Sequence, residues 1–208
     1  MSINPKIFRK YDIRGIADTD LSDAVVRSIG QALGTYLQDE HDIEQIIVGR
    51  DNRVSGQRLR DALCWGLTRT GMNVLDIGVC STPMLYWYAV TQDTAGVMIT
   101  GSHLDAPFNG FKIAVGKAAL YGESIQEIYE LTTGEDLATG EGIITLQADS
   151  VTPYLADVSS KVTPKALKVA VDPGNGTAGI YVDQLMAAWG QEAFTINMEL
   201  DGTFPNHA

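Results

Sequence analysis

The sequence predicts an α/β protein, with a mixed, mostly parallel sheet sandwiched by helices and the beginning of a second, similar α/β domain. Short apolar runs such as "EQIIVGRD" and "AGVMIT" alternate with segments whose apolar residues recur at helical spacing. Alternation of this kind is typical of a parallel sheet with helices on both faces. With 208 residues, 45% of them apolar, the chain can bury one full core and part of another.

The first two thirds of the chain contain most of the predicted elements. The opening helix follows the start signal "DTDLSD", and the next begins at a capping serine and closes on Gly71. We predict helices at residues 22–39, 55–71, 82–92 and 124–134, strands at 44–51, 73–78 and 95–100, and an antiparallel strand at 110–116. Together these form one complete domain.

A second unit follows a polar, glycine-rich stretch at residues 134–142, "GEDLATGEG", which is expected to be an exposed connection. The predicted elements are helices at residues 151–162 and 176–190 and strands at 166–172 and 191–200. One strand-helix-strand unit cannot cover both faces of its sheet, so this domain is expected to be unfinished. We therefore divide the chain into residues 1–145, the first domain, and residues 146–208, a linker helix and the truncated start of a second domain.

Composition excludes several classes of protein. The 26 acidic and 15 basic residues give a net charge of −11, which disfavours nucleic acid and anionic membranes as partners. The N-terminus "MSINPKIFRK" has no apolar segment of a secretion signal, and no run of about 18 apolar residues occurs, so we expect a cytoplasmic protein. Cys64 and Cys80 are too few for a disulfide framework and are expected to be buried thiols.

The stretch "TGSHLDAPFNGFK" places Ser102 beside His103 just after a predicted parallel strand. Turn residues dominate the stretch, so an ordinary loop is one reading. However, open sheets of this class bind ligands at the carboxyl ends of their strands, which favours a functional site. A hydrolase elbow would need glycines two residues to either side of the serine, where this chain has Thr100 and Leu104, so a serine hydrolase is disfavoured.

Basic residues gather in the segments "FRKYDIRG" and "GRDNR", with one more just beyond the serine stretch. They are Arg9, Lys10, Arg14, Arg50, Arg53 and Lys112. If the sheet brings the strand ends together, these side chains would form a positive pocket for a phosphorylated small molecule. The alternative, solvated surface charges, remains open.

One motif points elsewhere. The segment "GNGTAG", residues 174–179, has the G-x-G-x-x-G spacing of a dinucleotide fold, with Glu199 about 20 residues onward. The chain ends nine residues after Glu199 and offers no site for hydride transfer. Dinucleotide binding therefore remains a minor alternative.

Six blocks together resemble the bacterial phosphomannomutase/phosphoglucomutase group of the α-D-phosphohexomutase superfamily. They are "FRKYDIRG", "VGRDNRVSG", "DIGVCSTPM", "GVMITGSH" with "NGFKI", "VDPGNGTAG" and "DGTFPNH". They occur in the family's order and cover essentially the whole chain. The resemblance implies that residues 1–145 are the first domain of that family and contain its phosphoserine loop.

The resemblance also implies an activity, that of an isomerase acting as an intramolecular phosphotransferase. Phosphate moves between the C1 and C6 oxygens of a hexose phosphate through a bisphosphate intermediate. Ser102 would carry the phosphate and His103 would lie beside it, while Lys112 and Arg14 would balance its charge and Tyr11 would shape the wall. The catalytic set is then Ser102, His103 and Lys112, and the substrate- or phosphate-binding set is Tyr11, Arg14 and Lys112.

Two further arginines are assigned a structural role. Arg50 and Arg53 are expected to hold loops through ion pairs with neighbours such as Asp12 or Asp51 rather than to contact substrate.

The serine loop departs from the family pattern after the serine-histidine pair. The family usually continues with Asn-Pro, whereas this chain has Leu104 and Asp105. The change removes an amide that could order the loop and adds a charge that would repel phosphate, so we expect a reshaped or less easily phosphorylated loop.

The resemblance implies magnesium as a cofactor of the full-length family, bound in part through the phosphate on Ser102. The family's other metal ligands, an Asp-Gly-Asp-Gly-Asp pattern, are absent from this sequence. We therefore expect a truncated form that binds magnesium weakly and has negligible activity alone. The alternative is a non-catalytic sugar-phosphate-binding or interaction fragment. The expected partners are a hexose phosphate or bisphosphate and, through the unfinished domain, a second copy of the chain.

Overall fold

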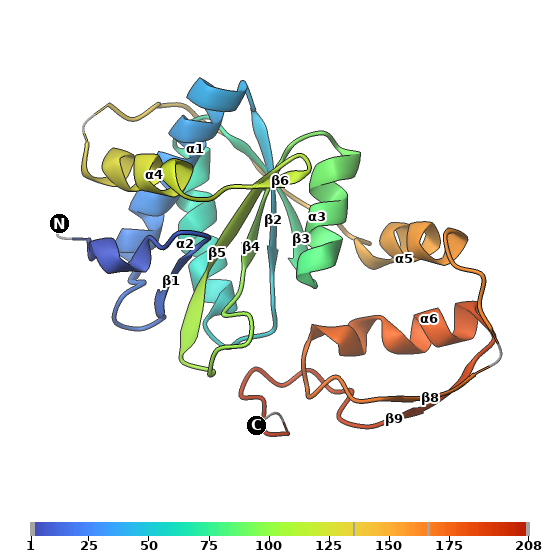
Figure 1. Cartoon of the computed structure of the whole chain (residues 1–208). Helices are drawn as coiled ribbons and strands as arrows, with labels where there is room; N and C mark the ends of the chain where they lie inside the picture. Colours follow the sequence, from blue (N-terminus) through green and yellow to red (C-terminus); the bar gives the residue numbers. More distant parts are fainter. Residues whose placement is uncertain (1–2, 135, 166, 207–208) are drawn as a thin grey trace.

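The computed structural model describes residues 3–134, 136–165 and 167–206, and its largest feature is a seven-stranded sheet (Figure 1). Along this sheet the strands are ordered β1-β5-β4-β2-β3-β7, and β6 pairs with β5. The strands are β1 (Ile13–Ile16), β2 (Gln45–Arg50), β3 (Asn73–Val79), β4 (Ala95–Ile99), β5 (Phe108–Val115), β6 (Ala118–Ala119) and β7 (Ile144–Leu146). Pairing is parallel among β2, β3, β4 and β7, while β5 pairs antiparallel with both β1 and β4. The predicted mixed, mostly parallel sheet is confirmed.

Helices cover both faces of this sheet, as predicted. The helices α1 (Asp23–His41), α2 (Gly56–Thr68) and α4 (Glu123–Thr133) lie on one side, and α3 (Thr82–Thr91) lies on the other (Figure 1). The side chain of Ser22 accepts a hydrogen bond from the Val25 amide and caps α1. This helix ends where Asp42 adopts a left-handed conformation, with φ of 54°.

The strands separate two hydrophobic cores. On β2, the side chains of Ile46 and Val48 join the larger core, whereas Ile47 joins the smaller core on the α3 side. On β4, Val97 and Met98 divide in the same way. This alternation follows from the two-residue repeat of a strand, and burial on both faces explains why the sequence runs are almost entirely apolar.

Several predictions about the first unit need correction. Strand β1 was not predicted, since its segment stood out for its basic residues and as part of the block "FRKYDIRG" and not for an apolar pattern. The predicted connection at residues 134–142 is exposed or half-buried wherever the structure describes it, and it also touches the first unit, because Gly140 forms a bridge with Thr70. A side chain at Gly142 would collide with the carbonyl of Met72. The chain then adds β7 as a parallel edge strand, because this connection follows the end of α2 and the turn into β3 closely enough to pair.

The second unit consists of α5 (Val151–Ser160), β8 (Lys168–Val171), the 3-10 helix η2 (Thr177–Ile180), α6 (Val182–Ala188) and β9 (Glu192–Thr195). Strands β8 and β9 form a parallel two-stranded sheet. The predicted continuous helix at residues 176–190 is therefore two shorter segments. The predicted strand at residues 191–200 ends at Thr195, because Asn197 turns to a φ of 51° and the chain goes on to bond with Asn175.

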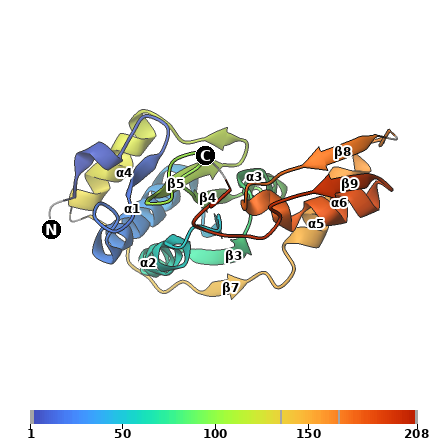
Figure 2. The same cartoon turned by 90° about the horizontal axis from the view of Figure 1, so that it is seen from below.

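The second unit lies against the α3 side of the first in both views (Figures 1 and 2). The hydroxyl of Tyr181 accepts a hydrogen bond of 2.7 Å from the Ser81 amide at the start of α3. The pKa of Tyr181 is raised to about 12, mainly because the side chain is buried. Further contacts join Trp87 to Asp157, whose carboxylate accepts from the indole at 2.7 Å. The two units thus share an interface of buried aromatic and polar groups.

Both cysteines are buried and free, as predicted. Burial raises the pKa of Cys64 and of Cys80 to about 12, so both are protonated thiols at neutral pH. Among the described residues, no helix is both long and apolar enough to cross a membrane.

Candidate functional site

Ser102 lies on the loop between β4 and β5, at the carboxyl end of a parallel strand. Its backbone is left-handed, with φ of 55°, and its side chain is exposed. A non-glycine residue in this conformation costs about 1–2 kcal/mol. Surrounding contacts must offset this cost for the serine to hold its position.

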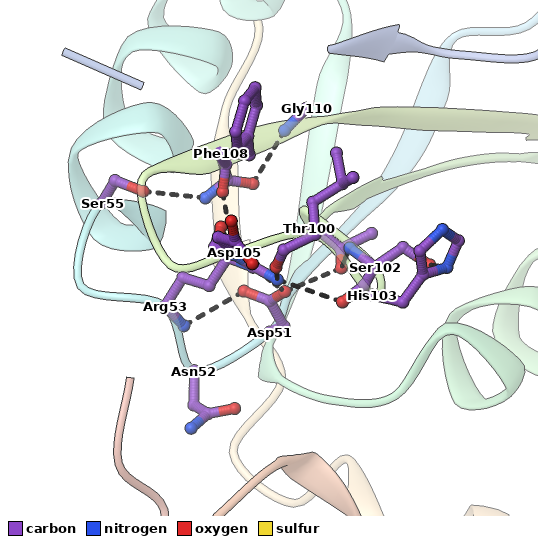
Figure 3. A network of polar contacts seen from close by, with 12 residues as sticks. Asp51, Asn52, Arg53, Ser55, Thr100, Ser102, His103, Asp105, Phe108 and Gly110 are labelled. Atoms are coloured by element: carbon purple, nitrogen blue, oxygen red, sulfur yellow. Dashed lines mark hydrogen bonds and ion pairs between the residues drawn. The ribbon is translucent and has the colours of Figure 1, made fainter. Parts of the chain in front are cut away.

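A short relay of hydrogen bonds holds the backbone of Ser102 (Figure 3). Its amide donates to the hydroxyl oxygen of Thr100 at 2.8 Å, and that hydroxyl donates to the Asp51 carboxylate at 2.7 Å. Thr100 and Asp51 are both buried. Because a carboxylate only accepts, the direction of both bonds is settled.

Arg53 occupies the interior of the same loop and is only 3% exposed. Its Nε donates to the Asp51 carboxylate at 3.1 Å, and its other four N–H groups donate to carbonyl oxygens of the loop. The accepting carbonyls belong to Ser102 (3.0 Å), Leu104 (2.6 Å), Asp105 (2.7 Å) and Phe108 (3.0 Å). The expected structural role of Arg53, paired with Asp51, is confirmed, whereas Arg50 bonds to the neutral side chain of Gln57.

These contacts bear on the unusual Leu104 and Asp105. Arg53 and the Leu104 amide, which donates to the Gly101 carbonyl, order the loop through its backbone. These bonds use backbone groups and so do not depend on the side chains of Leu104 and Asp105. The side chain of Asp105 is exposed and lines the same cavity as Ser102, where its charge would oppose an added phosphate.

A second cluster of charges lies on β1 and β5. Arg14 forms a two-pronged ion pair with the Asp12 carboxylate, and Lys112 Nζ donates to the same carboxylate at 3.3 Å. Burial raises the pKa of Asp12, but the hydrogen bond and charge of Arg14, with help from Lys112, outweigh it and leave that pKa below its usual value. The hydrogen bond to Asp12 raises the pKa of Arg14. Two cations and one anion leave the cluster with one net positive charge.

The structure does not bring this cluster into contact with Ser102. Lys112 is the strand partner of Met98, and Arg14 that of Gly110, so their side chains share the sheet face of Met98, which lines a cavity with Ser102 and His103. Among the described residues, no hydrogen bond or ion pair joins either cation to the serine. Tyr11 is 64% exposed and stacks on Tyr121, with ring centroids 6.4 Å apart.

His103 lies beside the serine, with its Nδ1 3.5 Å from Ser102 Oγ. That distance is long for a hydrogen bond. The imidazole points away from Asp51 and Arg53 (Figure 3), and in the described part of the chain no carboxylate is hydrogen-bonded to it. The arrangement is therefore not a hydrolase triad.

Two adjoining cavities of about 410 Å³ each open at the serine loop. Both are lined by the loop and by the second unit, which contributes Gly176, Thr177, Thr203 and Phe204. The ring of Phe204 also lies 5.1 Å from the Arg53 guanidinium. The first residues of α3, Ser81 to Pro83, line one of the cavities. This contribution of the second unit was not predicted, although the block "DGTFPNH" contains two of the residues, Thr203 and Phe204.

The described residues do not form a metal site of their own. No group of three histidine, cysteine or acidic side chains in residues 3–134, 136–165 and 167–206 could hold an ion. The nearest buried carboxylate, Asp51, is used by Arg53 and Thr100, and Asp12 is used by Arg14 and Lys112.

The glycine-rich segment at residues 174–179 forms hydrogen bonds with later residues of the same chain. Asn175 donates from its side chain to the Glu199 carbonyl at 3.0 Å and accepts from Asn206 at 2.9 Å. The segment leads into a 3-10 helix and then a helix of seven residues, rather than directly into a long α-helix. This geometry gives no support to dinucleotide binding.

Comparison with known sequences identifies relatives of the whole chain. Residues 5–139 match the model of the phosphoglucomutase/phosphomannomutase α/β/α domain I. A phosphoglucomutase of Neisseria meningitidis is 38% identical over 99% of this chain. A phosphomannomutase/phosphoglucomutase of Pseudomonas aeruginosa is 40% identical over 97% of it. The chain spans 45% and 43% of those relatives, just under half of their length.

Solved structures agree. A phosphoglucomutase/phosphomannomutase family protein from Burkholderia thailandensis superposes with a TM-score of 0.93 at 34% identity, over 99% of this chain and 47% of the other. A phosphomannomutase-like structure from Thermus thermophilus, 20% identical with a TM-score of 0.82, shares the fold over 95% of this chain and 47% of the other. The match over residues 5–139, together with these relatives, shows that the chain belongs to the phosphoglucomutase/phosphomannomutase family.

Proposed function

We propose that this chain supplies the phosphoserine part of a phosphohexomutase, which interconverts hexose 1-phosphate and hexose 6-phosphate. One observation carries the proposal. The exposed Ser102 is held at the end of a parallel strand, in a cavity between two units, by hydrogen bonds to both its amide and its carbonyl. Phosphoryl transfer depends mainly on such positioning and on charge neutralisation.

The proposed reaction moves one phosphoryl group in each half. A hexose hydroxyl attacks the phosphorus on Ser102, the new sugar O–P bond forms, and the Oγ–P bond breaks. The hydroxyl releases its proton and Ser102 Oγ takes one up, leaving a hexose bisphosphate. The reverse step, at the other phosphate, restores the phosphoserine. His103, 3.5 Å from Oγ, is the proposed group that carries the proton to or from the serine.

Positive charge near the cavity supports a phosphate on Ser102. The cluster of Arg14, Lys112 and Asp12 has one net positive charge on the sheet face beside the cavity. The N-terminus of the ten-residue helix α3 lines the same cavity, and its dipole favours an anion. We propose Arg14 and Lys112 as phosphate-binding groups, and Tyr11 as part of the outer wall.

Residues 1–145 and 146–208 are proposed as two domains, although the boundary falls inside β7. Magnesium is a proposed cofactor of the complete site, with the Ser102 phosphate as one ligand. The proposed partners are a hexose phosphate or bisphosphate, and a second copy of the chain through β8 and β9. The expected cytoplasmic location also remains a prediction.

The decisive measurement is the intact mass of the purified protein, before and after incubation with glucose 1,6-bisphosphate and magnesium. A phosphoserine adds about 80 Da, the mass of one phosphoryl group. We expect that increase in the wild-type chain and its absence in Ser102→Ala. Ser28→Ala, which removes a serine hydroxyl from helix α1, is the matched control and should still gain the mass. An unmodified wild-type chain would contradict the proposal.

A second candidate is a non-catalytic sugar-phosphate-binding or interaction fragment. It is favoured by the exposed Asp105 beside the serine and by the absence of a metal site among the described residues. Calorimetric titration with glucose 1,6-bisphosphate separates the cases. Saturable heat without phosphorylation would indicate a binder, whereas no heat at all would leave only an interaction role.

A further inference from the structure

We infer that Thr100, Asp51 and Arg53 act as one positioning unit that sets the reactivity of Ser102 by holding the backbone of the serine. The inference rests on the proposed phosphoserine function. Its basis is the pattern of bonds around the serine, since both peptide groups of Ser102 are held from inside the protein.

The amide side is held by the relay. Asp51 can only accept, so the Thr100 hydrogen points toward it and the Thr100 lone pair faces the Ser102 amide. A hydroxyl in this position cannot be replaced by a methyl group of equal size without leaving both the amide and the carboxylate short of a partner. The relay therefore depends on the oxygen atom of Thr100 and not on the shape of its side chain.

The carbonyl side is held by Arg53. A guanidinium has five N–H groups, and here one bonds to Asp51 and four bond to loop carbonyls. The guanidinium also lies against the backbone at Gly101, where an added Cβ would come within 2.5 Å of Arg53 Cζ. Arg53 has no donor left for a phosphate, which makes it a positioning residue.

Asp51 holds both Thr100 and Arg53 in place. Its two oxygens accept from the Arg53 backbone amide, the Arg53 Nε and the Thr100 hydroxyl. All three residues are buried, whereas Ser102 is exposed. The unit thus holds the serine backbone in its left-handed turn and leaves the hydroxyl free to react. Loss of the relay should let Oγ sample positions from which in-line transfer fails.

Thr100→Val tests the relay, and Thr100→Ser is the conservative rescue because it retains the hydroxyl. Thr35→Val is a matched control, since buried Thr35 also donates to a carbonyl (Gln31, 2.9 Å) and accepts from an amide (Ala138, 3.0 Å), far from the serine loop. The first readout is amide hydrogen exchange of residues 101–108 by mass spectrometry. The second is the rate of Ser102 phosphorylation as a function of glucose 1,6-bisphosphate concentration.

We expect Thr100→Val to speed exchange in the loop about tenfold. It should slow the maximal phosphorylation rate about tenfold or more, with the half-saturating bisphosphate concentration unchanged. Thr100→Ser should behave as the wild type does, and Thr35→Val should change neither readout. Wild-type exchange and rate in Thr100→Val would overturn the inference, as would an equal loss of rate in Thr35→Val.

A second pair of variants covers the case in which Thr100→Val fails to fold. Arg53→Lys keeps a cation beside Asp51 but loses the planar fork that reaches four carbonyls. It should show the same two changes, while Arg60→Lys, at the Arg60–Asp76 pair, should show neither. A wild-type chain that takes up no phosphate would refute the proposed function, and the exchange readout alone would then decide whether the unit positions the loop.

Discussion

The two units of this chain are built from the same strand-helix pattern but differ in how well their sheets are covered. In the first unit, helices pack on both faces, and β4 is buried along its whole length. In the second, the side chains of β8 and β9 alternate between exposed and half-buried, and Phe194 is 73% exposed. An apolar sequence pattern is thus enough to specify a strand. The side chains of that strand become buried only where other elements pack on both faces of its sheet.

The two units also contribute different parts of the candidate site. The first unit holds Ser102 and its supporting bonds, and the second supplies Thr177, Thr203 and Phe204 to the cavity walls. A stable sheet thus fixes the proposed reactive group. The less covered unit forms the wall that faces it.

The largest effect is expected from a cavity in the covered core. Leu63 on α2 is fully buried, so Leu63→Ala should lower the free energy of unfolding by about 3 kcal/mol. Urea denaturation followed by circular dichroism measures this value. Leu167→Ala in the second unit, where the side chain is 63% exposed, should cost less than about 0.5 kcal/mol. Equal losses would mean that the units are equally well covered.

The next largest effect concerns the junction between the units. Tyr181→Phe removes the acceptor of the Ser81 amide and should weaken docking of the second unit by about 1–2 kcal/mol. Limited proteolysis should then cut residues 160–206 faster than in the wild type. Tyr154→Phe is the control, because no hydrogen bond of its hydroxyl is found in the described residues. Unchanged cleavage in Tyr181→Phe would show that this bond does not hold the unit in place.

A smaller effect is expected from the charge cluster on the edge of the first sheet. The pKa of Asp12 is lowered in the folded state, so its contribution to stability is present above its unfolded pKa and is lost as the pH falls through the folded value. The free energy of unfolding of the wild type should therefore fall by about 1 kcal/mol more than that of Asp12→Asn between about pH 5 and pH 2. Urea denaturation at several pH values measures it, and parallel curves would contradict the assignment.

The smallest effect on the free energy of unfolding is expected from a substitution on the exposed face of β9. The same substitution should have a clear effect on self-association of the chain. Phe194→Ser should change the free energy of unfolding by less than about 0.5 kcal/mol. If a second copy covers this face, the variant should shift the sedimentation of concentrated protein toward the monomer. Glu192→Ser, also exposed on β9, is the control. A wild-type chain that is already monomeric would exclude self-association through this face.

Much of the fold could be predicted because its signals are local. Apolar runs and capping residues located α1, α2, α3, α4 and α5 to within a few residues at each end. Strand β7 was missed, because three residues between polar neighbours have too weak a pattern. The break between η2 and α6 was also missed, because Gly179 packs against the backbone at Met198, a contact distant in sequence.

The candidate site was predicted in part. The position of Ser102 at a strand end followed from the order of the elements, and the structural role of Arg53 followed from the resemblance. Arg14 and Lys112 were expected to gather around the serine, but the structure pairs them with Asp12 on the neighbouring strands. A nearby acid competes for a cation more strongly than composition alone reveals.

The sequence by itself determined the α/β class, the helices of the first unit with its strands β2, β3, β4 and β5, and the place of Ser102 after β4, because side-chain periodicity and turn chemistry act over a few residues. Only the tertiary structure decided that the serine is left-handed, that Arg53 has no donor left for a ligand, and that the second unit lines its cavity. Those features depend on bonds between residues about 50 or more positions apart, which exist only once the strands have assembled.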